Sequence, residues 1–378
     1  MKLLDFLRPP EAYTRRSGPL DKIVLSSRVR LARNLDSVPF PGHSKKAQRV
    51  EALKVLLPAV AGVSAMEGGV SEGMSKLSAL EKQILVERHL ISREHAARGG
   101  GSAVVLSKDE VISVMINEED HLRMQVILPG LQVREAWTRI DEVDSQLESN
   151  VPYAFSSKYG YLTACPTNLG TGIRVSAMLH LPGLVLAEHI NQIITSVNKL
   201  GLAVRGLYGE GTEALGNVFQ VSNQMTLGES EEEIAVKLDK VVKQIVENEE
   251  NARKKLLETS PKTLLNHIGR AYGVLSHAHS ISSKETKNLL SLLRLGVDLK
   301  LFPSEHGPLV DELFIITEPA HIQRLTEGKK SAEERDVLRS DLLRERLAKV
   351  PRPRDSVIEQ ASDASGPAEE GEAESEAS

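Results

Sequence analysis

The chain has 378 residues, of which 40% are hydrophobic and 26% are charged, and its formal net charge is −5. This composition is typical of a globular protein with two or three domains. It contains no run of about 18 apolar residues, which excludes a membrane-spanning helix. No basic stripe is interleaved with aromatic residues, so we expect no direct contact with nucleic acid. The single cysteine, Cys165, excludes an intramolecular disulfide and a four-thiolate zinc site, and we expect a cytoplasmic protein.

The first two thirds of the chain mix strands and helices. Apolar or alternating runs predict strands at 104–106, 111–117, 122–128, 173–181, 202–208 and 217–223, with a loop at 62–78 and a helix at 184–199. The strands follow one another closely and the helices are interspersed irregularly. We therefore predict an α+β fold with a largely antiparallel sheet flanked by helices.

The last third of the chain is predicted to be helical. A capping box at Ser230 and Glu233 opens a long helix over 231–258, and further helices follow, including a charged one over 332–349. Residues 351–378 hold eight acidic and two basic residues with little to bury, which predicts a disordered acidic tail. The expected divisions are an extension at 1–20, an α+β domain at 21–258, an all-helical domain at 259–350 and the tail at 351–378.

Arginines recur on the predicted strands. The strand period of two puts Arg28 and Arg30 on one face of their strand, opposite Val29. Several guanidiniums on one sheet face would repel one another unless a polyanion lay between them, and arginine clamps phosphate through two parallel hydrogen bonds. The pattern therefore favours a triphosphate site. The other arginines of this kind are Arg123, Arg174 and Arg205.

Common nucleotide and metal signatures are missing from the sequence. There is no P-loop pattern and no G-x-G-x-x-G after a strand, and the H-R-D and D-F-G motifs of ordinary protein kinases do not occur. His277 and His279 lack the cysteine or carboxylate pattern of a metal site, so we predict no protein-held metal.

Five sequence blocks, in order, resemble the ATP:guanido phosphotransferase (phosphagen kinase) family. They are SSRVRLARN (26–34), RHLIS (88–92), NEEDHLRMQ (117–125), YLTACPTNLGTGIR (161–174) and RGLYGEGTEALGN (205–217). The stretches MLHLPGLVL and VSNQMTLGESEEEI extend the resemblance to the bacterial protein-arginine kinases of the McsB type, over about 21–349. The resemblance implies a phosphagen-kinase catalytic domain at 21–258 and a regulatory or dimerisation domain at 259–350.

Ordinary phosphagen kinases carry a helical domain before the first arginine motif, which helps to enclose a small guanidino substrate. Here that motif begins at Ser26. We therefore expect an acceptor site that admits an arginine on a protein surface.

The resemblance also assigns roles to single residues. An arginine acceptor is protonated up to a pKa above about 12, so it must be held and must lose a proton as the phosphoryl group arrives. The resemblance implies Glu119 as catalytic base, Glu210 as a second contact of the guanidinium and Cys165 as a positioning thiol. Apart from the motifs, Glu119 could equally lie in a solvated turn, and a lone cysteine is usually a small buried hydrophobe.

The nucleotide site carries over from the same motifs. The substrate would be ATP with Mg²⁺, and the ion would be held mainly by phosphates and water. The implied ATP-binding residues are Ser26, Ser27, Arg28, Val29, Arg30, His89, Arg123, Arg174, Val175, Ser176, Ala177, Met178, Arg205, Gly206, Leu207, Tyr208, Gly209 and Glu210.

A second site is implied near the end of the helical domain. Arg335 and Arg339 lie one turn apart on the predicted helix, a spacing equally typical of a charged, solvated helix. The McsB-type family has an R-D-x-x-R-A motif here that binds phosphoarginine and activates the kinase. This chain keeps Arg335, Asp336 and Arg339 but has Ser340 in place of the alanine.

The resemblance implies an ATP-dependent protein-arginine kinase that marks proteins for stress-response regulation or proteolysis. Implied partners are proteins with accessible arginines, a zinc-binding activator protein, a Clp-type unfoldase or protease, and a second copy of the chain. A free-guanidine phosphagen kinase is an alternative, which the missing N-terminal domain disfavours. An inactive phosphoarginine-binding adaptor is another, which the presence of Glu119, Glu210 and Cys165 disfavours.

Overall fold

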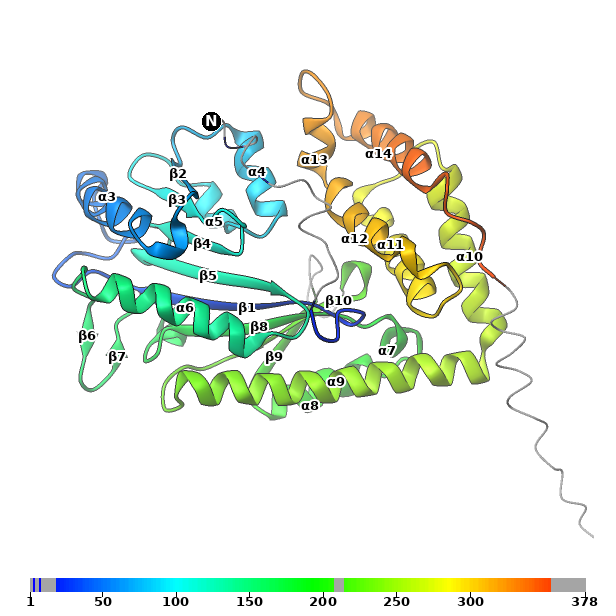
Figure 1. Cartoon of the computed structure of the whole chain (residues 1–378), viewed down its shortest axis with the longest axis horizontal. Coiled ribbons are helices and arrows are strands. Elements are labelled where there is room, and N and C mark those ends of the chain that lie inside the picture. The colour runs from blue at the N-terminus through cyan, green and yellow to red at the C-terminus, as the bar shows by residue number, and fades with distance from the viewer. Residues whose placement is uncertain (1–2, 4–6, 8–17, 207–213, 355–378) are drawn as a thin grey trace, which may run out of the picture.

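The computed structural model describes residues 3, 7, 18–206 and 214–354. At its centre lies an eight-stranded sheet with the order β2-β3-β4-β5-β1-β8-β10-β9, in which every neighbouring pair is antiparallel (Figure 1). The predicted α+β fold with a largely antiparallel sheet is confirmed. The strands are β1 (Val24–Arg33), β2 (Val70–Gly73), β3 (Ala103–Leu106), β4 (Ile112–Ile116), β5 (Leu122–Pro129), β8 (Ile173–His180), β9 (Leu202–Gly206) and β10 (Val218–Asn223).

One face of the sheet is apolar and covered by helices. Val29, Met124 and Val175 are fully buried on this face, as the strand alternation predicts, and α6 and α9 pack over it (Figure 1). Aliphatic side chains make up almost all of this core, because aromatic residues are only 3% of the chain. The helices of this part are α3 (Lys46–Ala61), α4 (Ala79–Glu87), α5 (Arg93–Ala96), α6 (Val133–Glu148), α7 (Pro182–Leu186), α8 (Ile190–Lys199) and α9 (Glu231–Thr259), and a small hairpin joins β6 (Phe155–Ser156) to β7 (Gly160–Tyr161).

Two local predictions were wrong. Residues 62–78 are not only a loop, since Val70–Gly73 forms the edge strand β2 through backbone pairing with β3, which side-chain periodicity does not reveal. The helix predicted at 184–199 is two helices, α7 and α8, separated at Glu188, whose φ of 59° is incompatible with an α-helix. The capping box at Ser230 is confirmed: its Oγ accepts from Glu233 N at 3.2 Å, and Glu233 Oε2 accepts from Ser230 N at 2.7 Å.

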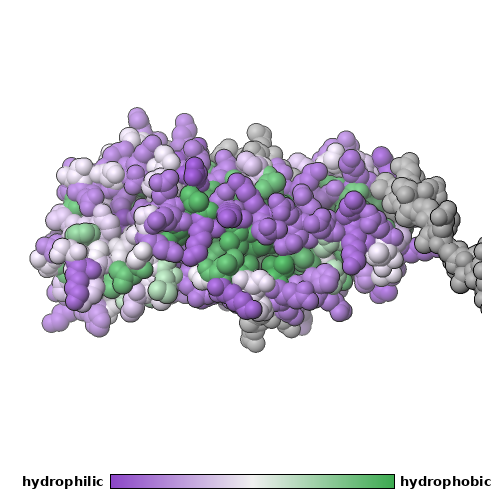
Figure 2. Space-filling model, turned by 90° about the horizontal axis from the view of Figure 1, so that it is seen from below, coloured by the Kyte–Doolittle hydropathy of each residue, from purple (hydrophilic) through white to green (hydrophobic). Residues whose placement is uncertain are grey.

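The C-terminal part is helical, as predicted (Figure 1). It has an apolar cluster of its own. Its helices are α10 (Pro261–His277), α11 (Ser283–Asp298), α12 (Gly307–Ile316), α13 (Pro319–Arg324) and α14 (Ala332–Leu347). The predicted extension and acidic tail fall largely outside the described residues. Within the described part of the chain, none of the helices has the length and apolar character needed to cross a membrane. Figure 2, a view from below, shows polar side chains over most of the surface and apolar ones gathered near the middle of this face.

Arg294 of α11 joins the helical part to the sheet. Its side chain is 2% exposed, and its guanidinium donates to the backbone oxygens of Asp21 and Lys22 at 2.9 and 2.7 Å. The same group pairs with Asp311 at 2.6 Å and contacts His180 Nδ1, at the end of β8, at 3.1 Å. One buried cation therefore ties α11 to the segment before β1 and to the end of β8.

Replacing Arg294 with Met is expected to lower the free energy of unfolding by about 3–5 kcal/mol, because it removes one member of a buried ion pair. Urea unfolding followed by circular dichroism measures this. Lys54→Met is the matched control, since Lys54 and Glu51 form an exposed pair, and its unfolding midpoint should match that of the unsubstituted chain. Equal midpoints for both variants would contradict the role given to Arg294.

Candidate active site

The arginines predicted to converge do so on the sheet face opposite the apolar core. Arg28 and Arg30 lie on the central strand β1, and Arg30 is directly paired with Arg174 on β8. Arg123 projects from β5, the other neighbour of β1, and Arg205 lies on β9 at the edge of the sheet. Five guanidiniums from four strands thus share one face.

These charges are close enough to perturb one another. Burial, followed by the charges of Arg28, Arg123 and Arg174, lowers the pKa of Arg30 well below its usual value. Burial and the charges of Arg205 and Arg123 likewise lower the pKa of Arg174. The buried Nε atoms of Arg30 and Arg174 have no hydrogen-bond partner among the residues that the structure describes. Unsatisfied donors on crowded cations are suited to the oxygens of a polyphosphate.

A cavity of about 550 Å³ opens over this face. It is lined by Arg28, Arg30 and Arg123, with Met178 and Gln220 from β8 and β10. His89 forms part of its wall, just after α4, and burial together with the charges of Arg28 and Lys287 lowers the pKa of His89 to about 4. The imidazole is therefore neutral at physiological pH and can contact a ligand without adding charge.

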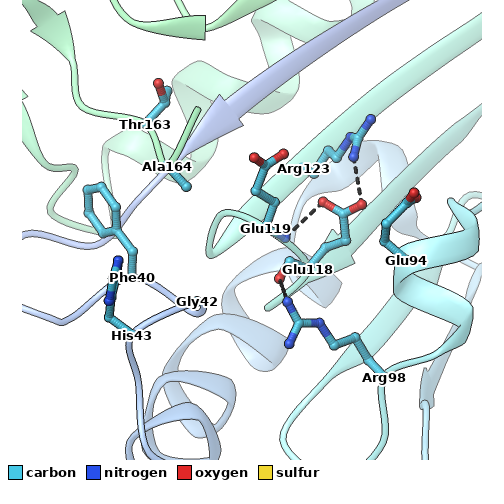
Figure 3. Close-up of a pocket in the computed structure, with 10 residues that line it drawn as sticks. All are labelled: Phe40, Gly42, His43, Glu94, Arg98, Glu118, Glu119, Arg123, Thr163 and Ala164. Atoms are coloured by element: carbon cyan, nitrogen blue, oxygen red, sulfur yellow. Dashed lines mark hydrogen bonds and ion pairs between the residues drawn. The ribbon is translucent and has the colours of Figure 1, made fainter. Parts of the chain in front are cut away.

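A second cavity, of about 880 Å³, adjoins the first (Figure 3). Arg123 and Glu94 line both cavities, so they mark the shared wall. Glu119 lies on the second cavity, as Figure 3 shows, together with Phe40, Gly42, His43, Arg98, Glu118, Thr163 and Ala164. The predicted catalytic base thus faces a cavity next to the predicted phosphate-binding arginines.

Three consecutive acidic residues take different roles. Glu118 is buried and accepts from Arg123 and Ser92, each at 2.6 Å. Asp120 is buried and its Oδ1 accepts from Asn34 Nδ2 and Ala164 N, each at 2.6 Å. Glu119, between them, is exposed to the cavity, and desolvation with the charges of Asp120 and Glu118 raises its pKa. A carboxylate with a raised pKa is a better proton acceptor than an ordinary surface glutamate.

Cys165 lies in the loop that Asp120 holds. The residue is half-buried, and its Sγ lies 3.0 Å from Thr167 Oγ1. Thr226 secures the other side of the loop by donating to the oxygens of Thr167 and Leu169, at 3.1 and 2.6 Å. Sequence reasoning missed Asp120 and Thr226 as supports of the loop, because no local pattern shows which distant backbone group a side chain will reach.

Comparison with known proteins gives this geometry its context. The chain matches the family model of the ATP:guanido phosphotransferase C-terminal catalytic domain over residues 60–252, and that of the protein-arginine kinase McsB C-terminal domain over 261–358. A protein-arginine kinase of Halothermothrix orenii is 45% identical over 87% of this chain and 94% of its own, and one of Bacillus licheniformis is 47% identical over 89% and 93%. The chain belongs to the protein-arginine kinase family.

A solved structure supports the same placement. The crystal structure of a lombricine kinase matches with a TM-score of 0.54 and 27% identity, over 65% of this chain and 71% of its own. The family predicted from the motifs is confirmed, and with it an ATP-dependent phosphotransferase. The roles of single residues stay predictions.

Some residues of the predicted nucleotide site point away from it. Val29, Val175 and Ala177 are fully buried in the core on the opposite face of the sheet, so their side chains cannot contact ATP there. Ser27 also turns inward, where its Oγ donates to Gly130 O at 2.9 Å. The alternation along each strand explains this, since a continuous motif always includes residues of both faces. Ser26, Ser176 and Met178 share the arginine face, Gly206 ends β9, and Leu207, Tyr208, Gly209 and Glu210 lie outside the described residues.

The residues of the predicted phosphoarginine site lie on α14. Arg339 is buried and donates to the oxygens of Thr317 and Ile281, at 2.7 and 2.9 Å, and it pairs with Asp336 at 2.5 Å. Arg335 is half-buried and donates to Lys330 O at 2.7 Å, while Ser340 Oγ donates to Val337 O. In this conformation Arg339 serves the packing of the helical part, and phosphoarginine binding stays a prediction.

Replacing Arg30 with Met is expected to abolish ATP binding and to raise the melting temperature of the ligand-free protein by about 2 °C, because burial and three neighbouring cations disfavour the Arg30 charge. Arg33→Met is the matched opposite. Burial lowers the pKa of Arg33, but the charges of Asp144 and Glu231, together with Tyr161 and the hydrogen bond to Asp144, outweigh it and raise the pKa, so this substitution should lower the melting temperature. Differential scanning calorimetry and titration with ATP give both readings. A lower melting temperature for Arg30→Met would contradict the repulsion.

The acid limb of the pH–rate profile should depend on Asp120. The raised pKa of Glu119 means that, as the pH falls, this predicted base becomes protonated above the usual carboxylate range. Asp120→Asn removes a negative charge but keeps an oxygen for Ala164, so the limb should move to lower pH. Asp120→Ala loses that contact as well and should lower turnover at every pH. ADP release measured over pH gives both results, and an unmoved limb in Asp120→Asn would exclude this coupling.

Proposed function

We propose that this chain transfers the γ-phosphoryl group of ATP to the guanidinium of arginine side chains in proteins. The observation that carries the proposal is the pair of adjoining cavities: one has the arginine face and the other has Glu119, and Arg123 and Glu94 lie on the wall that they share. A phosphoryl group at this wall would lie between its nucleotide and its acceptor. The names of the relatives support protein arginine as that acceptor.

The chemistry is a direct in-line transfer. The bond between the γ-phosphorus and the bridging oxygen breaks, a bond from the acceptor nitrogen to phosphorus forms, and ADP leaves. Arg30, Arg123 and Arg174 would stabilise the charge that spreads over the phosphoryl oxygens. Glu119 would orient the guanidinium and accept its proton, and Cys165 would help to position it. No covalent enzyme intermediate is needed, since both substrates reach the shared wall together.

Mg²⁺ would arrive with ATP as part of the substrate. The unsatisfied Nε donors of Arg30 and Arg174 fit phosphate oxygens, while Glu118 is already engaged by Arg123 and Ser92. Phosphate and water oxygens would therefore supply most of the coordination of the ion. Glu94 is an exposed carboxylate at the shared wall and would accept from a water bound to the ion.

The cellular setting belongs to the same proposal. Phosphoarginine would mark proteins for stress-response regulation or proteolysis, with a zinc-binding activator and a Clp-type unfoldase or protease as partners. The chain would act in the cytoplasm, where ATP is supplied, and as a homodimer. Phosphoarginine that binds at Arg335, Asp336, Arg339 and Ser340 would regulate the enzyme.

The test is to incubate the protein with Mg²⁺ and ATP together with either an unfolded basic protein or free arginine. Mass spectrometry under non-acidic conditions then locates the phosphoryl group, because the P–N bond is labile in acid. We expect phosphoarginine in the unfolded basic protein when the unsubstituted chain is used. The Glu119→Gln variant should form none, and the Glu51→Gln variant, a control on the exposed face of α3, should form it as before. Phosphate on free arginine alone would replace the proposal with a phosphagen kinase. No product, with an activator present, would replace it with a phosphoarginine-binding adaptor.

A further inference from the structure

The end of α4 lines the cavity of about 550 Å³ over the arginine face, which is the proposed nucleotide cavity. Val86 and His89 both line it, and His89 has a φ of 59°, in the left-handed region that residues other than glycine seldom adopt. Such a backbone conformation costs free energy and persists only where neighbouring groups hold it. One such group is Gln125, whose Nε2 donates to His89 O at 2.7 Å.

The C-terminal helical part supplies further contacts through α13. Glu87, the last residue of α4, accepts from the backbone nitrogens of Ala320 and His321, at 2.8 and 3.2 Å. Its Oε2 also lies 2.9 Å from His321 Nδ1, and both side chains are almost fully buried. Ala320 joins the apolar cluster that contains Ile84 and Leu85 of α4. The two helices therefore form one packed unit, although they are more than 200 residues apart in sequence.

His321 contacts two consecutive residues: Glu87, the last residue of α4, and Arg88, which caps that helix. While Nδ1 donates to Glu87, Nε2 accepts from Arg88 Nε at 3.4 Å. These two contacts require the neutral ring with its proton on Nδ1. Arg88 is buried in turn and pairs with Glu110 at 3.1 Å. The ring thus bridges the two residues that come directly before His89.

The turn that precedes α13 is held in place by other residues of the helical part. Arg339 donates to the oxygen of Thr317, and Glu318 pairs with Lys287 of α11 at 2.5 Å, so the turn before α13 is held on both sides. Lys287 also lies near enough to His89 for its charge to help burial and Arg28 lower the pKa of that imidazole. The helical part therefore contacts the two residues that directly precede His89, and the charge of Lys287 acts on His89 itself.

We propose that His321 is a positioning residue for nucleotide binding: it holds Glu87 and Arg88 in place and so sets His89 in the wall of the cavity. The nucleotide site then depends on more than the arginine face of the sheet, because the C-terminal helices hold His89 in its place. This inference rests on the proposed function only in taking that cavity as the site of ATP.

The test compares His321→Ala, His321→Asn and Gln323→Ala in the full-length chain. Gln323 lies on the same helix, but among the described residues its side chain bonds to Thr326, Gly328 and Lys330, all close to it in sequence, so it is the matched control. Isothermal titration with Mg²⁺ and ATP, without acceptor, should show a dissociation constant raised about three- to tenfold in His321→Ala. His321→Asn keeps a donor to Glu87 and loses the acceptor for Arg88, so it should show a smaller rise. Gln323→Ala should bind as the unsubstituted chain does.

A kinetic reading separates positioning from general loss of structure. In His321→Ala the KM for ATP should rise, while kcat at saturating ATP and the KM for the acceptor stay unchanged. ATP affinity unchanged in His321→Ala overturns the inference, and if that variant does not fold, unchanged affinity in His321→Asn does so. Weakened binding in a chain that phosphorylates no arginine would leave the inference standing and remove only the proposed function. A chain that binds no ATP would overturn both.

Discussion

Mutual repulsion among the guanidiniums that share one sheet face is the constraint on which this structure depends. Arg30 lies within the field of three other arginines, and burial and these charges together disfavour its own charge. A sheet can hold such a cluster only if the rest of the fold compensates for it. The compensation comes from the same strands, whose alternate residues bury aliphatic side chains under α6 and α9 on the opposite face. The site and the core are thus two faces of one set of residues.

The three consecutive acidic residues Glu118, Glu119 and Asp120 have different surroundings and different contacts. Glu118 offsets the charge of Arg123, and Asp120 holds the loop of Cys165, so Glu119 is left to face the cavity of about 880 Å³. The charges of its two neighbours contribute to its raised pKa. Support of the site and tuning of its proposed base therefore arise from the same two carboxylates.

The attachment of the helical part follows the same physical logic. Buried polar contacts attach the helical part at two places. Arg294 joins α11 to the segment before β1. His321 joins α13 to Glu87 and Arg88 at the end of α4. Buried polar contacts are directional, so they define how two parts fit together more closely than apolar packing alone. In the positioning role proposed for His321, this directionality couples the position of α13 to His89.

The sequence by itself determined the α+β class, the face on which Arg28 and Arg30 lie, the capped helix that begins at Glu231 and the family. These follow from periodicity, capping and motifs, which are local properties of the chain. Only the tertiary structure decided that 70–73 forms an edge strand, that Glu188 separates α7 from α8, and that Asp120 holds Ala164. It alone brought His321 to Glu87 and Arg88. Such contacts join residues far apart in sequence, and no local pattern specifies which distant group a buried side chain will meet.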